Sequence, residues 1–116
     1  MISVNPANSE IIAKYQPLNK VELLNKINIT HEAFLLWKDI DLEFRKDFLL
    51  KISHKLRQNV GCHAEIITAE MGKPIRESRL EVEKCAWLCD YYASNSISYL
   101  KNKTIQTEAS LSYLSY

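Results

Sequence analysis

The chain has 116 residues, of which 47% are hydrophobic and 25% charged, and its formal net charge is +1. This length suits one domain with a modest core, the composition is that of a folded chain, and the interleaved, nearly balanced charges exclude a broad basic surface for nucleic acid. The three cysteines form no disulfide framework, no stretch is apolar enough to span a membrane and the first residues do not form a signal peptide, so we expect a cytoplasmic protein.

The N-terminal residues predict a β-hairpin. Two short β-prone runs, 2–4 and 11–15, flank an Asn-Pro-Ala-Asn segment at 5–8. Proline fixes one backbone angle there, and asparagine side chains commonly bond the backbone of their own turn. We therefore expect a turn at this segment.

Two amphipathic helices follow. Asn19 and Glu22 have the spacing of a capping box, and apolar residues at helical intervals predict a helix over about 20–38. Asp41 is suited to cap a second helix. Its apolar stripe would consist of Phe48, Leu49, Ile52 and Leu56.

Glycine and proline punctuate the next part of the chain. Val60-Gly61 is expected to end or kink the second helix, and a third, short helix stops at Gly72, which takes a left-handed cap without steric penalty. Pro74 prevents its continuation. A long helix over 75 to about 101 then has a small-residue face that another element can approach closely. Its apolar stripe would comprise Ile75, Val82, Cys85, Ala86, Cys89, Tyr92, Ala93, Ser96 and Leu100.

The last residues change to a period of two, which predicts a strand over about 104–116. This strand would carry Leu111 and Tyr113 on one face and Leu114 and Tyr116 on the other. Apolar residues on both faces require partners on both sides. The expected fold class is mainly α (α+β), with an N-terminal β-hairpin, three to four amphipathic helices and a C-terminal β-strand.

Several segments together resemble the N-terminal part of an aldehyde dehydrogenase. They are Glu-Met-Gly-Lys-Pro at 70–74, Glu-Val-Glu-Lys-Cys-Ala at 81–86 and Tyr-Tyr-Ala at 91–93, with Val-Asn-Pro-Ala-Asn at 4–8 and Thr-Glu-Ala-Ser at 107–110 extending the likeness over nearly the whole chain. Any helix can end in Gly-Lys-Pro for capping alone. The order and spacing of the other segments favour the family, and the resemblance is strongest to the NAD(P)-dependent succinate-semialdehyde dehydrogenases.

The resemblance implies that residues 1–103 belong to the helical part of the cofactor-binding domain and that 104–116 begin the oligomerisation β-arm. The complete enzyme would oxidise an aldehyde to a carboxylic acid by cysteine attack, hydride transfer to NAD or NADP and thioester hydrolysis. In the family the nucleophilic cysteine, the general-base glutamate and the cofactor loops lie further along. We therefore expect no catalytic, cofactor-binding or metal-binding residue in this chain, and no activity of the chain alone.

The expected partners are the remainder of the dehydrogenase or a homo-oligomer formed through the C-terminal strand, with no nucleic acid and no membrane. The alternative is a free-standing helical protein-interaction module derived from the same family. Measuring the mass of the chain in solution, with and without the rest of the enzyme, would discriminate between the two.

Leu80, Lys84 and Trp87 line up with Tyr91 on a second face of the long helix. In the family this part of the helix faces the aldehyde entrance tunnel, where a cation at Lys84 would attract the carboxylate of a semialdehyde. The competing interpretation is a solvated lysine whose stem covers Trp87.

The cysteines and histidines do not have the pattern of a catalytic or metal-binding site. Cys85 is expected to pack as a small hydrophobe together with Cys89 rather than to act as a nucleophile. Cys62-His63, with His54 and His31, lacks the spacing of a zinc site.

Overall fold

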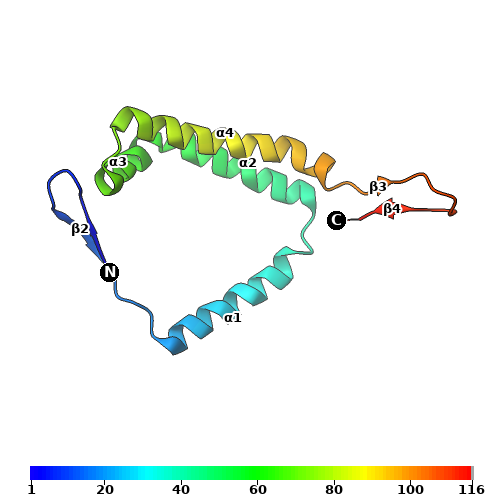
Figure 1. The fold of residues 1–116 in the computed structure, drawn as a ribbon, viewed down its shortest axis with the longest axis horizontal. Helices are drawn as coiled ribbons and strands as arrows, with labels where there is room; N and C mark the ends of the chain where they lie inside the picture. Colours follow the sequence, from blue (N-terminus) through cyan, green and yellow to red (C-terminus); the bar gives the residue numbers. More distant parts are fainter. Residues whose placement is uncertain (116) are drawn as a thin grey trace.

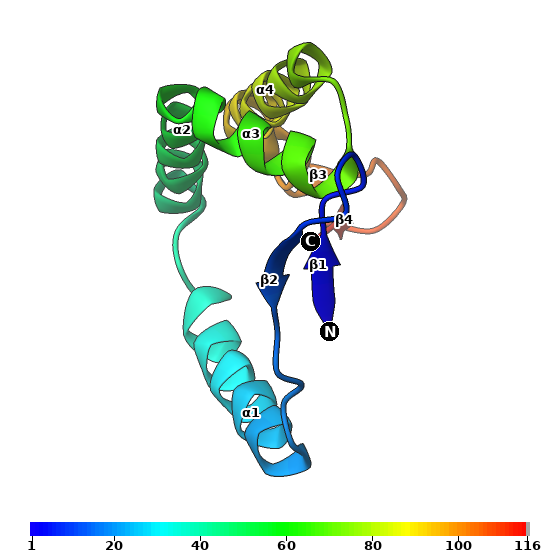
Figure 2. The ribbon, with the colours of Figure 1, turned by 90° about the vertical axis from the view of Figure 1, so that its left-hand side faces the viewer.

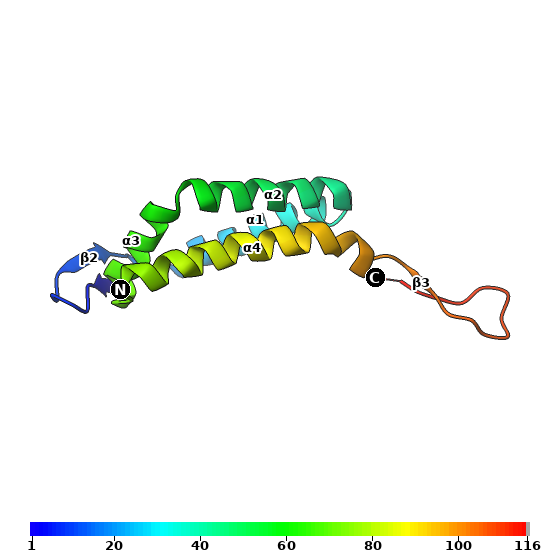
Figure 3. The same ribbon diagram turned by 90° about the horizontal axis from the view of Figure 1, so that it is seen from above.

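Two long antiparallel helices pack side by side along one edge of the open fold. The structure is a computed structural model and describes residues 1–115. Helix α2 (Leu42–Gln58) runs toward α3 (Val60–Met71), which turns the chain back into α4 (Ile75–Tyr99), as Figures 1 and 3 show. Both α2 and α3 pack against α4. The predicted helices are thus present, with the last one ending slightly earlier than expected.

Small side chains form the packed seam between these helices. The buried residues are Ser53, Ala64, Ser78, Val82, Ala86 and Ala93. Short side chains let helix backbones approach closely, and Ser78 is hydrogen-bonded through its hydroxyl to Thr68 Oγ1 at 3.0 Å. The prediction of a small-residue face on the long helix is confirmed. The prediction that Cys85 packs in the core is wrong, because Cys85 is exposed and Cys89 is only half-buried.

The predicted helix caps are present. At the start of α1 (Lys20–Trp37), the Glu22 amide donates to Asn19 Oδ1 at 3.0 Å and the Asn19 amide donates to Glu22 Oε2 at 2.9 Å, which completes the capping box. Asp41 Oδ1 accepts from the Glu43 amide at 2.6 Å and caps α2. These local signals were readable because each cap lies within three residues of its partner.

The break after α2 falls at Asn59 rather than at Gly61. Asn59 leaves the helical region, with φ −115° and ψ 22°, and its side-chain amide donates to the Lys55 carbonyl at 2.9 Å. An asparagine that bonds the backbone in this way competes with helix continuation. Gly61 instead lies inside the first turn of α3.

Helix α1 stands apart from the other helices and is held at an elbow. The Arg45 guanidinium donates to the carbonyls of Ile40 at 2.9 Å and Lys38 at 2.8 Å, which supplies partners for carbonyl groups at the end of α1. Trp37 contacts Phe48 edge to face, with 5.7 Å between the ring centroids. Beyond this elbow α1 extends away from α2 and α4, and it contains no buried residue (Figure 2).

The N-terminal hairpin pairs β1 (Ile2–Val4) with β2 (Ile11–Lys14), as predicted. Its turn is held by the Asn5 side chain, which accepts from the Ala7 amide at 2.9 Å. The hairpin lies against the end of α3, where Gly72 adopts a left-handed conformation with φ 69°. A β-carbon at Gly72 would lie 2.8 Å from Pro6 Cγ, so the contact requires glycine for space as well as for conformation.

The C-terminal residues form a second hairpin, so the prediction of one continuous strand is wrong. Strand β3 (Lys103–Thr104) pairs antiparallel with β4 (Tyr113–Leu114). The intervening loop is closed by side-chain hydrogen bonds, including Thr107 to Ser112 at 2.7 Å. Serine and threonine hydroxyls that bond within a loop favour a turn over continued pairing. Tyr116, expected on one face of the strand, lies outside the described residues.

The described part of the chain is open and exposes much apolar surface. Its radius of gyration is 20.7 Å, whereas a compact domain of this length would have about 13 Å. Its accessible surface is 9710 Å², whereas a compact 13.5 kDa monomer exposes about 6,500 Å². Within residues 1–115, no helix combines the length and the apolar character needed to cross a membrane.

Replacing Gly72 with alanine should destabilise the chain by about 1–2 kcal/mol, because the new β-carbon meets Pro6 and the left-handed conformation disfavours any side chain. Gly61→Ala is the matched control, since a β-carbon there meets open space inside a helix and should stabilise by about 0.5–1 kcal/mol. Urea denaturation followed by circular dichroism measures both. Equal midpoints for the two variants would contradict the proposed contact.

Candidate functional site

The face of α4 that lies away from the packed seam carries the predicted site residues. Leu80 and Trp87 are each 57% exposed, and Lys84 between them is exposed as well. Spacings of four and three residues place the three side chains on one side of the helix. The structure therefore brings Leu80, Lys84 and Trp87 onto a common outward surface.

An open cavity of about 440 Å³ occupies the first part of this face. It is lined by Lys73, Glu77, Leu80, Glu81 and Lys84. Lys73 forms an ion pair with Glu81. Lys84 forms no ion pair with any residue of the described chain. Its positive charge is therefore not neutralised by a neighbouring carboxylate and can attract an anion in the cavity.

An aromatic row continues the face beyond Lys84. The rings of Trp87 and Tyr91 are 5.8 Å apart, and the Tyr91 and Tyr99 hydroxyls are 2.5 Å apart. The hydrogen bond with Tyr91, followed by desolvation, raises the pKa of Tyr99. The Tyr99 phenol therefore remains neutral at physiological pH, and the row offers apolar ring surface next to Lys84.

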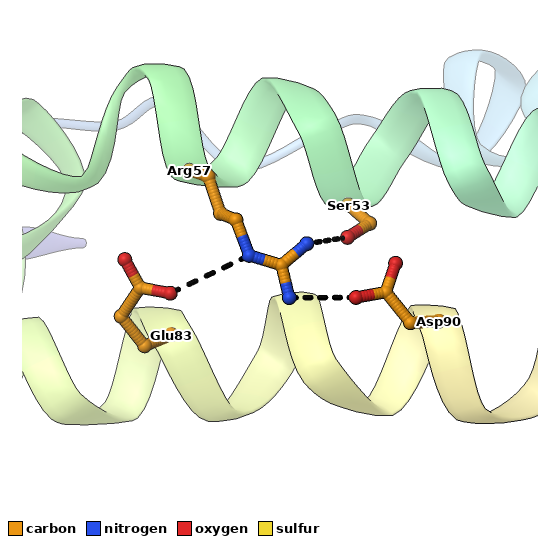
Figure 4. A network of polar contacts seen from close by, with 4 residues as sticks. All are labelled: Ser53, Arg57, Glu83 and Asp90. Carbon is orange, nitrogen blue, oxygen red and sulfur yellow. Dashed lines mark hydrogen bonds and ion pairs between the residues drawn. The ribbon is translucent and has the colours of Figure 1, made fainter.

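A polar cluster on α2 and α4 fixes how the two helices are aligned. Arg57 extends from α2 toward α4 and is hydrogen-bonded to Ser53 and, at 2.6 Å, to Asp90 Oδ2 (Figure 4). Glu83 Oε2 lies 3.6 Å from Arg57 Nε. One guanidinium thus contacts two carboxylates that lie two turns apart on α4, which sets the alignment of that helix against α2.

The contacts within this cluster favour the charged forms of Asp90 and Arg57. The hydrogen bond from Arg57 lowers the pKa of Asp90, with a smaller contribution from the Ser53 hydroxyl. The pKa of Arg57 is raised, chiefly by the same hydrogen bond to Asp90. Because the groups are partly exposed, each ion pair contributes only modestly to stability.

Helical spacing predicted that Leu80, Lys84 and Trp87 share a face of α4, but it did not indicate which residues surround that face. The pairing of Lys73 with Glu81 joins a loop to a helix, outside the three- and four-residue spacings that pattern analysis uses. Arg57 and Asp90 are 33 residues apart, so no local signal links them.

Cys85 does not pack in the core as expected. It lines an apolar cavity of about 280 Å³ that His63 also lines. In residues 1–115 no three His, Cys, Asp or Glu side chains are grouped to hold a metal ion.

Comparison with known proteins identifies the class to which this arrangement belongs. The sequence model of the Aldehyde dehydrogenase family matches residues 1–116. The chain is 31% identical over 98% of its length to a probable NADP(+)-dependent succinate-semialdehyde dehydrogenase of Synechocystis, and 32% identical over 99% to the NAD(P)+ succinate semialdehyde dehydrogenase Sad of Escherichia coli K12.

A solved structure supports the same class. The succinic semialdehyde dehydrogenase of Streptococcus pyogenes, in complex with NADP+ as the cofactor, superposes with a TM-score of 0.90 at 28% identity, covering 97% of this chain. The chain belongs to the aldehyde dehydrogenase family. It spans 25% of the length of each of these three relatives.

Because of the ion pair between Arg57 and Asp90, the free energy of unfolding should depend on pH in the acid range. Because the folded pKa of Asp90 lies below its ordinary value of 3.8, the pair stabilises the fold above that value, and the stabilisation is lost as pH falls through the lowered pKa. Between about pH 5 and pH 3 the urea midpoint should therefore fall more steeply for the wild-type chain than for Asp90→Asn. Glu32→Gln, on the isolated helix α1, should keep the wild-type slope. Identical slopes for all three proteins would show that the pair contributes nothing.

Proposed function

We propose that the chain is part of an NAD(P)-dependent succinate-semialdehyde dehydrogenase, which oxidises the aldehyde to a carboxylic acid. Residues 1–103 would supply the helical part of the cofactor-binding domain, and 104–116 would begin the oligomerisation arm. The observation that carries this proposal is the family match over the whole chain, together with relatives of this specificity at 28–32% identity.

The outward face of α4 is our candidate for contact with the substrate. Succinate semialdehyde carries a carboxylate, and Lys84 provides a cation beside the apolar surface of Leu80 and Trp87. Glu81 is neutralised by Lys73, while Glu77 lies seven residues before Lys84, about 10 Å along the helix axis. That distance is near the Debye length of about 8 Å at physiological salt, so Glu77 weakens the attraction only slightly.

We propose that the described residues 1–115 do not themselves form a dinucleotide phosphate site. Such a site uses a glycine-rich turn at the start of a helix. The chain has two glycines: Gly61 lies within α3, and Gly72 ends that helix against Pro6. The proposed NAD or NADP site is therefore assigned to other parts of a complete enzyme.

The second hairpin suits a role in assembly. Its two-residue strands pair only with each other within the described chain, and their edges are free to extend a larger sheet. Leu111, Tyr113 and Leu114 expose apolar surface there. We propose that this hairpin contacts the remainder of the dehydrogenase or a neighbouring subunit.

The substrate assignment is testable in a chimera in which residues 1–116 replace the matched quarter of the E. coli relative. Lys84→Met should raise KM for succinate semialdehyde about fivefold, which corresponds to about 1 kcal/mol for a partly screened charge. The kcat should change little, because the lost attraction acts equally on the bound substrate and on the transition state. Steady-state kinetics measures both parameters.

Two controls make this result specific. KM for an uncharged aldehyde of similar length should be unaffected by Lys84→Met. Lys101→Met, which removes an exposed lysine beyond the end of α4, should leave KM for both aldehydes unchanged. If Lys84→Met alters KM equally for both aldehydes, or not at all, Lys84 is a solvated surface residue.

The isolated 116-residue chain should bind neither NAD+ nor NADP+, because Gly61 lies inside α3, Gly72 caps that helix, and no glycine-rich turn begins a helix within residues 1–115. Calorimetric titration at millimolar nucleotide would give no saturable heat. A micromolar dissociation constant for either nucleotide would refute the assignment of the cofactor site to other parts of the enzyme.

A further inference from the structure

Helix α1 carries apolar side chains on two opposite faces. Leu23, Ile27 and Phe34 follow one face, and a second set follows the other. At 100° per residue the mean directions of the two sets differ by about 170°. The second set consists of Val21, Ile29 and Leu36.

Neither face of α1 has a residue buried by the rest of the described residues, 1–115. Val21 is 77% exposed and Leu36 is 76% exposed, while Ile27 and Phe34 on the other face are each more than half exposed. A helix at the surface of a protein usually has one apolar stripe, and a helix that is apolar on all sides is usually buried. The elbow at Arg45 holds the end of α1, and the rest of the helix extends away from α2 and α4 (Figure 2).

The excess accessible surface of the chain indicates how large a partner surface is needed to bury it. The chain exposes about 3,000 Å² more than a compact monomer of its mass. A standard interface with a second copy would cover about 800 Å² of this chain, and a large obligate dimer about 1,000–2,500 Å². The relatives are four times as long as the matched region, so a family-length chain can supply more cover than a second copy can.

We propose that both faces of α1 are covered by the three quarters of a family-length dehydrogenase chain that lie outside the matched region, so that α1 is an internal helix enclosed from opposite sides. This inference rests on the proposed function, because it takes the rest of such an enzyme as the partner. It goes further in assigning the Val21, Ile29 and Leu36 face to a buried contact.

The test introduces one lysine on each face of α1 in the chimera described above. Ile27→Lys and Ile29→Lys should each lower the melting temperature of the chimera, and the two losses should agree within a factor of two. Ala33→Lys is the matched control, because Ala33 lies on the strip that carries Glu22 and Lys26 between the two faces. It should leave the melting temperature unchanged. In the isolated chain none of the three variants should change the urea midpoint, since nothing covers α1 there.

Specific outcomes would overturn the inference. If Ile29→Lys leaves the chimera unaffected while Ile27→Lys destabilises it, α1 is covered on one side only. If Ile29→Lys abolishes self-association of the isolated chain in light scattering, a second copy is the occupant. Should the lysine chimeras be insoluble, Ile27→Ala and Ile29→Ala provide the same comparison of melting temperatures.

The outcome is separable from that of the proposed function. The α1 variants are read by melting temperature, whereas Lys84→Met is read by KM. A wild-type chimera that fails to fold would count against the proposed function. A folded chimera in which the second face tolerates lysine would count against this inference alone.

Discussion

The close contact of α2 with α4 is the constraint on which the other parts of the structure depend. Small residues such as Ser53, Ala86 and Ala93 let the two helices approach, and Arg57 aligns them by contacting Asp90 and Glu83. Helix α3 then packs on α4, the N-terminal hairpin lies on the end of α3, and α1 is attached through its elbow to α2. A larger side chain in the seam would therefore disturb every other element.

The same contact explains why the outer face of α4 is a suitable place for a functional surface. A helix whose inner side is packed and ion-paired cannot rotate freely, so the Cα–Cβ bonds on its outer side keep fixed directions. Lys84 and Trp87 are positioned in this way by contacts on the opposite side of their own helix. A site on a rigid helix is held more accurately than a site on a loop.

Local features of the fold were predictable, and contacts between distant residues were not. The capping box at Asn19, the cap at Asp41 and the left-handed Gly72 each depend on residues within a few positions of one another. The Lys84 face followed from helical spacing. The partner of Arg57 and the exposure of Cys85 depend on how α4 is rotated against α2, which periodicity alone does not determine. The C-terminal hairpin was missed because hydroxyl side chains interrupt a pattern that otherwise predicts one strand.

The contact of the N-terminal hairpin with the end of α3 also determines an order of events during synthesis. Ser3 donates to Glu70 Oε1 at 2.8 Å across a separation of 67 residues. At a translation rate of about 5–20 residues per second, the hairpin leaves the ribosome roughly 3–13 seconds before its partner does. During that interval its strands have only each other, and a two-stranded hairpin is at best marginally stable. The hairpin therefore reaches its final position only after the end of α3 has been made.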